Sequence, residues 1–201
     1  MNTIKRNELP NIGAELGSGF FAGLITFNGD EYAIVVSPKA DGEHKGAWGE
    51  YGVSIPGTNS CYDGLANTIA LADAGSDLAA SIRSLRIGNH DDWYLPSRDE
   101  LEVCYRNLKP TSTENYCSFR DGDNASSVPV GYPYTEQSPA QTSISQFQDD
   151  GEQAFNPDWY WSSMQSSALS AFYQVFGDGY QGSFSKFLEF RARAVRRLLV
   201  I

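Results

Sequence analysis

The sequence has few of the residues from which common catalytic and metal sites are built. It contains only two histidines, His44 and His90, and three cysteines among 201 residues. The cysteines Cys61, Cys104 and Cys117 form no CxxC pair, and an odd number does not fit a secreted scaffold held by disulfides. Both histidines lie in predicted loops without a carboxylate or a cysteine at ligand spacing. We therefore expect no resident metal and no cofactor.

Basic residues and long apolar runs are also scarce. The chain has 15 Lys and Arg against 25 Asp and Glu, a formal net charge of −10. No basic stripe exists outside the last predicted strand, which argues against binding to a nucleic acid backbone. No run reaches the roughly 18 apolar residues that a membrane helix needs, and the N-terminus lacks the apolar core of a signal peptide. These absences predict a protein that folds in the cytoplasm, with no nucleic acid partner and no membrane insertion.

What is present predicts a single globular domain. Hydrophobic residues make up 41% of the chain and charged residues 20%, and 201 residues suffice for one sizeable core. Residues 1–17 are predicted to be a polar N-terminal arm, and residues 18–201 to be the domain.

Periodicity and turn signals predict an α+β fold. Asn28-Gly29 between two apolar runs indicates a β-hairpin. Apolar residues recur at helical spacing over residues 65–85, where Gly75 is a candidate break, and Ser97 with Glu100 forms the pattern of a capping box before a second helix that ends at Leu108. The end of the chain predicts a meander with a turn between its last two strands at 177–179; the three strands span residues 160–164, 171–176 and 188–198.

Residues 110–158 differ in character from the rest. They contain eight acidic residues, one basic residue and five of the nine prolines, with little periodicity. They also carry more aromatic residues than a disordered linker should have. We interpret this stretch as a folded, exposed loop insertion, in keeping with the functional role that long loops often have.

Three motifs occur in order along the chain. The first is Trp93-Tyr94-Leu95-Pro96-Ser97 with Glu100-Leu101, which predicts a strand end followed by a helix start. The second is Tyr160-Trp161-Ser162-Ser163. The third is a closing strand with Arg193 and Arg196.

In this combination the chain resembles a bacterial and phage domain family typified by the C-terminal domain of the Legionella collagen-like adhesin. The resemblance covers about residues 25–198, and the stretch 63–68 (Asp-Gly-Leu-Ala-Asn-Thr) is similar to a phage subgroup. It implies a C-type-lectin-like fold, with two helices against a twisted antiparallel sheet and a long loop insertion.

The resemblance also implies a function. It suggests a non-enzymatic binding module of a bacteriophage particle, at the tail or another host-facing position, that recognises a host-surface sugar or protein. Such a protein would be made in the bacterial cytoplasm and located in the virion, contacting other virion proteins and forming a homo-oligomer. The alternative is a structural virion protein, for capsid decoration or tail assembly, with no host ligand.

Candidate residues fall into two groups. We expect a structural role for residues that match the family motifs or fill the core: Trp93, Pro96, Trp161, Arg193 and Arg196. The arginines should be partly buried and paired, with Asp92 or Glu100 as candidate partners. We expect the ligand to bind residues of types common in adaptable recognition surfaces, namely Tyr132, Tyr134, Tyr173, Gln174, Asp178, Tyr180 and Gln181.

Other chemistry is weakly indicated. The stretch 121–124 (Asp-Gly-Asp-Asn) is superficially similar to a calcium loop, but it lacks the later bidentate Glu of an EF-hand. Ser162 and Ser163 have no identifiable base. Formylglycine-generating enzymes share a lectin-like fold, yet nothing marks Cys104 or Cys117 as redox-active.

Overall fold

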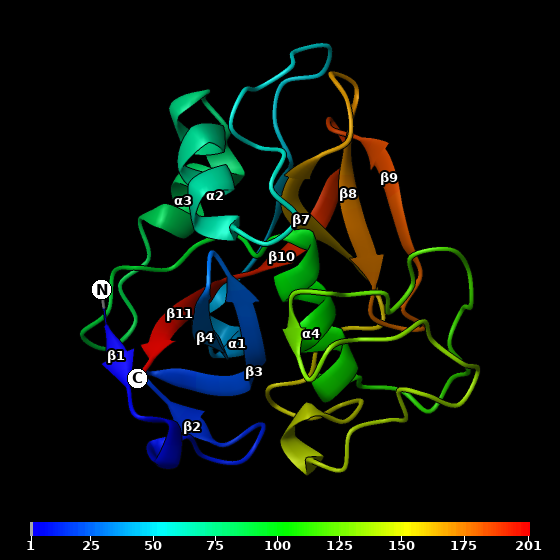
Figure 1. Cartoon of the computed structure of the whole chain (residues 1–201). Helices are drawn as coiled ribbons and strands as arrows, with labels where there is room; N and C mark the ends of the chain where they lie inside the picture. The colour runs from blue at the N-terminus through cyan, green and yellow to red at the C-terminus, as the bar shows by residue number, and fades with distance from the viewer. Residues whose placement is uncertain (1) are drawn as a thin grey trace.

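The protein has an α+β architecture with helices packed around two mixed β-sheets, as seen in the computed structural model, which describes residues 2–201 (Figure 1). This confirms the α+β prediction, but two mixed sheets replace the single antiparallel sheet that was expected. Four helices occur in this part of the chain: α1 (Lys39–Gly42), α2 (Gly64–Asp73), α3 (Asp77–Arg83) and α4 (Arg98–Leu108). Single 3₁₀ turns lie at Arg6–Glu8 and Ser145–Phe147.

The first sheet joins the two ends of the chain. Its order is β1-β11-β4-β3-β2, with β6 also paired to β3. The hairpin predicted at Asn28-Gly29 is present, and both of its turn residues have positive φ. The C-terminal strand lies between the N-terminal strand and the hairpin, so strands from the two ends of the chain are adjacent. The strands are β1 (Thr3–Ile4), β2 (Glu15–Leu16), β3 (Gly19–Phe27), β4 (Asp30–Val36), β6 (Ser127–Val128) and β11 (Val195–Val200).

The second sheet has the order β5-β10-β7-β8-β9. The predicted meander was incomplete, because the turn at 177–179 leads into a strand that the sequence analysis missed. The predicted closing strand, 188–198, is in fact two strands that belong to different sheets and are separated by Ala194. These strands are β5 (Glu43–Ala47), β7 (Trp159–Gln165), β8 (Ser170–Val175), β9 (Gln181–Ser185) and β10 (Glu189–Arg193).

The helices begin and end where the sequence signals are strongest. The long helical pattern divides at Gly75, whose φ of 91° ends α2 before Ser76 caps α3. Ser97 and Glu100 form both hydrogen bonds of a capping box at the start of α4. Residues 93–95, expected to form a strand, make only an isolated bridge between Tyr94 and the start of β11.

Buried side chains form two clusters on opposite faces of the same strands. Ala33 and Val35 of β4 belong to one cluster, and Ile34 and Val36 to the other, as the alternation of a strand requires. The first cluster packs under α2 and α3 and includes Trp93 and Trp161, both fully buried as predicted. The second packs under α4.

The two closing-strand arginines are fully buried, where partial burial was expected; Arg196 has the expected partner Asp92, whereas Arg193 has neither expected partner. Arg196 donates from Nε and Nη2 to both carboxylate oxygens of Asp92, at 2.7 and 2.9 Å. Arg193 donates to the carbonyl oxygen of Ser37 at 2.9 Å and lies 3.5 Å from Glu43. The change of sheet between them lets both arginines be buried, a solution that the three-residue spacing did not reveal.

The segment 1–17 is not the polar arm that was predicted, because it contributes β1 and β2 to the first sheet; Met1 lies outside the described residues.

Pro96 is buried, as its predicted structural role suggests. Its carbonyl oxygen accepts a hydrogen bond from Ser163 N–H of β7 at 2.8 Å, so the first two motifs contact each other. Among residues 2–201, no helix has the length and apolar character needed to cross a membrane.

Candidate functional site: an aromatic sheet face

One face of the second sheet carries a continuous row of aromatic side chains. We call this row the aromatic face; it consists of Tyr116, Trp159, Tyr173, Tyr180, Phe184 and Phe190. The residues come from β7, β8, β9 and β10, the turn before β9 and the start of the insertion. Strand alternation places the strand residues on one side of the sheet. The face is therefore a product of tertiary structure rather than of any one sequence segment.

Consecutive rings along the row are in contact. Tyr116 meets Tyr180 edge-on with centroids 4.9 Å apart, and Tyr180 lies 6.1 Å from Tyr173. Tyr173 stacks parallel on Trp159 at 4.5 Å. Trp159 also meets Phe184 of β9 at 5.7 Å and Phe190 of β10 at 4.9 Å, so the row spans four strands.

Two residues of this row are exposed to solvent, and Trp159, Tyr180 and Phe190 are half-buried. Tyr116 is 50% exposed and Phe184 44% exposed, whereas Tyr173 is buried beneath its neighbours. A shallow depression of about 400 Å³ lies beside Trp159, Phe184 and Phe190. That volume is at the small end of the roughly 300–1,000 Å³ typical of small-molecule sites.

The charged groups around the face are mostly acidic. Asp158 and Glu189 line the depression together with one base, Lys45. Asp158 also accepts a hydrogen bond from Arg191 Nε at 3.0 Å. The carboxylate of Asp178 accepts from Tyr180 N–H at 3.1 Å, at the other end of the row. Carboxylates at both ends accept hydrogen bonds and repel anions, so the face suits a neutral or cationic ligand.

The predicted ligand residues divide between the two sides of the sheet. Tyr173, Tyr180 and Asp178 belong to or border the aromatic face. Gln174 and Gln181 are buried, and Gln181 accepts a hydrogen bond from Arg98 Nε at 3.0 Å on the α4 side.

The two insertion tyrosines that were predicted to bind the ligand, Tyr132 and Tyr134, differ in their exposure to solvent. Tyr134 was expected to be an exposed anchor, but it is buried, and its hydroxyl donates to Glu102 at 2.7 Å. Its role is therefore to hold the insertion in place. Tyr132 is 78% exposed, and it is not part of the aromatic face.

Sequence analysis missed Trp159, Phe184 and Phe190 as site residues. Trp159 is half-buried. The alternation of Trp159 with Trp161 placed both on one face, but it did not show where the covering helices end. Phe184 lies on the strand that was not predicted.

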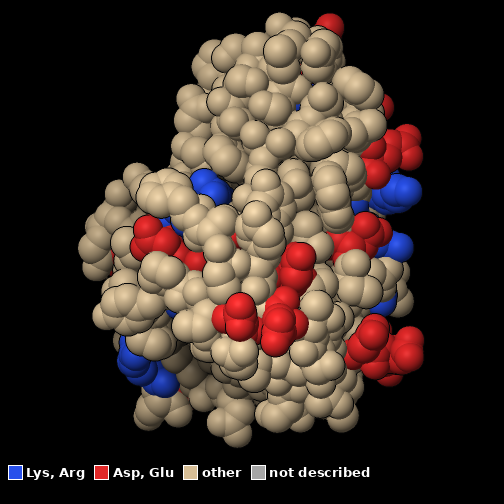
Figure 2. Space-filling model, turned by 90° about the vertical axis from the view of Figure 1, so that its right-hand side faces the viewer, with Lys and Arg blue, Asp and Glu red and all other residues tan. Residues whose placement is uncertain are grey.

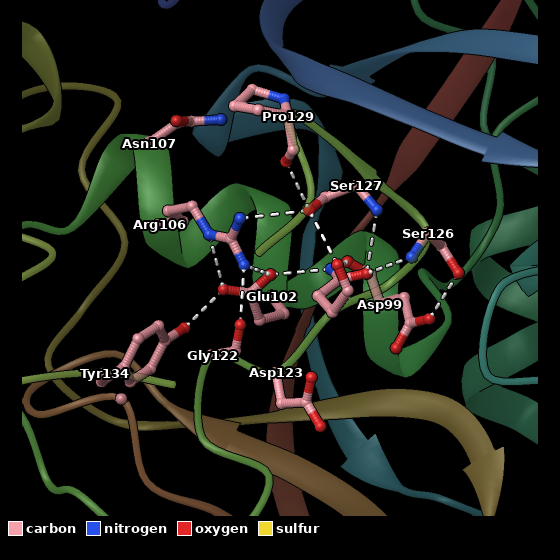
Figure 3. A network of polar contacts seen from close by, with 12 residues as sticks. Asp99, Glu102, Arg106, Asn107, Gly122, Asp123, Ser126, Ser127, Pro129 and Tyr134 are labelled. Atoms are coloured by element: carbon pink, nitrogen blue, oxygen red, sulfur yellow. Dashed lines mark hydrogen bonds and ion pairs between the residues drawn. The ribbon is translucent and has the colours of Figure 1, made fainter. Parts of the chain in front are cut away.

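Buried carboxylates of α4 hold the insertion against the domain (Figure 3). Glu102 accepts hydrogen bonds from Arg106 Nε and Nη2 at 3.0 and 2.7 Å, and from Asn124 Nδ2 at 2.7 Å. Asp99 accepts from Ser126 Oγ at 2.8 Å and from Arg120 Nη2 at 2.9 Å. We call Asp99 and Glu102 with these partners and Tyr134 the carboxylate clamp.

The carboxylate clamp explains how an insertion with so little regular structure is folded. The insertion supplies Asn124, Ser126 and Tyr134, and α4 supplies the charges that they bind. Phe147 and Phe155 add buried apolar anchors. The insertion is thus packed against α4 through several of its residues, which leaves less of it available to a ligand than the sequence analysis expected.

The clamp predicts a specific pH dependence of stability. Burial raises the pKa of Asp99, Glu100 and Glu102 above the usual carboxyl range. The folded chain then binds these protons more tightly than the unfolded chain, so the carboxylates contribute most stability at acid pH and lose it as pH rises through their folded pKa values. Burial lowers the pKa of His44, which acts in the opposite direction below about pH 6.5.

Comparing the parent with the Glu102→Gln variant cancels the contribution of His44 to the pH dependence of stability, because both proteins contain this histidine. We expect the difference in unfolding free energy between the parent and Glu102→Gln to shift in favour of the parent as pH falls from 7 to about 5. Urea denaturation of both proteins at several pH values measures this. A difference that is constant, or that shifts toward the variant, would show that Glu102 does not titrate with a raised pKa.

The remaining candidate groups have structural environments. Burial raises the pKa of the Cys104 and Cys61 thiols, so neither is an activated thiolate at neutral pH. The carboxylate of Asp121 accepts from Ser118 and from Gln181 N–H at 3.0 Å. Within residues 2–201, no group of three or more His, Cys, Asp or Glu side chains is arranged to hold a metal.

No family model and no curated protein matches this chain.

Proposed function

We propose that this chain is a non-enzymatic binding module of a bacteriophage particle, with a C-type-lectin-like fold, placed at the tail or another host-facing position. The observation that carries the binding proposal is the aromatic face. Monomeric proteins rarely expose a contiguous apolar patch without an interaction role. Aromatic side chains with a few polar groups are also the composition of protein and ligand recognition sites.

The phage context is supported by the motifs. The residues that carry the family resemblance are structural in this chain: Pro96 contacts β7, Ser97 caps α4, and Arg193 and Arg196 are buried where the chain changes sheet. The chain thus has a physical use for each of these motifs, as a shared fold would require.

The charge of the surface limits the chemical class of ligand that the chain can bind. The side of the molecule seen in Figure 2 shows acidic side chains over the middle of its lower half, with basic ones toward the edges, and above them a mostly uncharged surface with charges at its margin. The insertion has a net charge of −7, which repels anionic polymers. We propose that the ligand is a neutral host-surface sugar or a protein patch whose apolar surface covers the rings, with the rim carboxylates accepting hydrogen bonds.

Two measurements test the phage role. An antibody to the chain should label purified virions, and absence of the chain from virions would contradict the particle assignment. The purified chain added to host cells should compete with phage adsorption. Presence in virions together with no effect on adsorption would favour a structural virion protein instead.

Variants of the aromatic face test the site itself. Tyr180→Ala and Trp159→Ala should each weaken binding to host cells by about 2 kcal/mol, as expected for aromatic anchors, while the fold survives. Tyr132→Ala is the matched comparison, because this tyrosine is exposed on the insertion away from the row. Weaker binding by Tyr132→Ala and unchanged binding by Tyr180→Ala would move the site to the insertion.

A further inference from the structure

The strand β9 forms one edge of the second sheet, and no strand within residues 2–201 pairs with its outer side. Its sequence, Gln-Gly-Ser-Phe-Ser, contains no charged residue and no proline. Natural edge strands usually carry charges, proline or a bulge that discourages pairing with other chains. The opposite edge, β5, follows that pattern, because it carries Glu43 and Lys45. Of the two edges of the second sheet within residues 2–201, the β9 edge is the one without such protection.

The hydrogen-bond register shows which main-chain groups of β9 point outward. On the inner side, Tyr180 O accepts from β8 at 2.9 Å, and Lys186 N–H donates to the residue before β8 at 3.1 Å. Because every second residue of an antiparallel strand bonds to the same neighbour, the N–H and C=O groups of Ser183 and Ser185 are directed away from β8.

The first part of β9 is already covered. Gln181 N–H, which also points outward, donates to the carboxylate of Asp121 at 3.0 Å. The insertion therefore blocks this end of the strand. The free edge is limited to Ser183, Phe184 and Ser185.

Exposed apolar side chains lie near the free edge, while the charged groups Asp158, Glu189 and Lys45 line the depression on the aromatic face beside Phe184. Phe184 is nearly half exposed, and beyond β9 the side chain of Phe187 is 57% exposed and contacts Tyr51. Leu169, at the same end of the sheet, is also exposed. From this direction the upper part of the molecule is mostly uncharged, and the acidic side chains lie over the lower half and along the margin (Figure 2). Two copies could thus meet at this edge without bringing like charges together, even though each has a net charge of −10.

We propose that β9 pairs with β9 of a second copy of this chain, antiparallel, about a two-fold axis that passes beside Phe184. In this register the outward groups of Ser183 exchange hydrogen bonds with the outward groups of the partner's Ser185, and vice versa. Phe184 faces the partner's Phe184 at the closely spaced position of the ladder, where Cα atoms are about 4.5 Å apart and side chains pack directly.

This pairing is self-complementary, as a two-fold interface must be. The free edge has a serine on each side of a central aromatic residue, so the same three residues serve both copies. Cross-strand neighbours lie on the same face of a sheet, and Phe184 belongs to the aromatic face. The aromatic faces of the two copies would therefore join across the axis.

Charges of either sign introduced at Phe184, beside the two-fold axis, test the proposal. Sedimentation of the parent should show a monomer–dimer equilibrium that shifts with concentration. Phe184→Asp and Phe184→Lys should each be monomeric, because each places like charges opposite one another. An equimolar mixture of the two should regain the dimer, since only the mixed pair brings opposite charges together. Tyr132→Asp, which adds a charge on the exposed insertion, should dimerise like the parent.

The proposal is wrong if the parent stays monomeric up to sub-millimolar concentration, or if Phe184→Asp dimerises like the parent. It is also wrong if both charged variants fold as monomers and their mixture stays monomeric. Thermal melting confirms that each variant folds. If either charged variant does not fold, Ser183→Pro replaces it, because proline removes the outward N–H and is tolerated on edge strands. Dimerisation of that variant equal to the parent would equally contradict the pairing.

Discussion

Replacement of Glu102 by alanine should lower the free energy of unfolding by about 3–5 kcal/mol, the range for breaking a buried ion pair from one side. The Glu102 side chain is 2% exposed, and the substitution removes the acceptor for Arg106, Asn124 and Tyr134 together. The buried Tyr134 hydroxyl would lose its acceptor, while Arg106 and Asn124 would keep only their bonds to other groups such as Gly122 O and Asp99 O. Leaving buried donors short of acceptors is costlier than losing the pair itself. Urea denaturation measures the change.

Hydrogen exchange distinguishes this effect from a general loss of stability. On going from the parent to Glu102→Ala, amide exchange should accelerate more in residues 118–135 than in β3, β4 and β11, because the carboxylate clamp holds the insertion. Glu136→Ala is the matched control: Glu136 is an exposed glutamate on the same insertion, and its removal should have little effect. Equal stabilities of Glu102→Ala and Glu136→Ala would show that the clamp does not hold the insertion.

Arg196→Ala should lower the free energy of unfolding by about 2–4 kcal/mol. The arginine is fully buried and bidentate to Asp92, and it also donates to the carbonyl oxygen of Gly17 at 3.1 Å. The Asp92 side chain is about one-third exposed, so water can partly solvate it after the substitution, and we expect less than the largest values seen for fully buried pairs.

An exposed arginine of the same chain provides the control for Arg196. Arg86 lies 4.0 Å from Asp91, and both side chains are well exposed. Exposed pairs of this kind contribute less than about 1 kcal/mol. Thermal and urea denaturation of Arg86→Ala and Arg196→Ala should therefore give clearly different results. If Arg196→Ala melts like Arg86→Ala, the closing-strand arginine is not a structural anchor.

The parts of the fold that local sequence signals determine were predicted well. Asn28-Gly29 specifies its hairpin because both residues adopt positive φ, and Ser97 with Glu100 specifies the start of α4 through a capping box. Gly75 ended a helix as expected. In each case a short stretch contains all the groups that the structure uses.

Features that depend on long-range contacts were predicted poorly. The stretch 188–198 looked like one strand, because nothing local marks Ala194 as the point where the chain leaves one sheet for the other. Tyr134 looked like an exposed anchor, because the carboxylate that accepts its hydroxyl proton lies 32 residues earlier. Lys186 is fully buried and donates to Val53 O and Gln165, a position that no local pattern indicates.

The candidate site also contains residues that local sequence signals indicated and residues that depend on long-range contacts. Tyr173 and Tyr180 were named because tyrosine is a common recognition residue. Phe184 and Phe190 were missed because their exposure depends on where the covering helices end. Residue type therefore indicated part of the aromatic face, but only the sheet register assembled it.

Trp159 provides the most direct test of the proposal that the aromatic face binds the ligand. The other three tryptophans, Trp48, Trp93 and Trp161, are fully buried, so quenching of tryptophan fluorescence by acrylamide reports mainly on Trp159. When host-surface saccharide or protein is added to saturation, the account predicts that quenching falls toward the level of a Trp159→Phe variant. Saturable binding that leaves the quenching of Trp159 unchanged would contradict it.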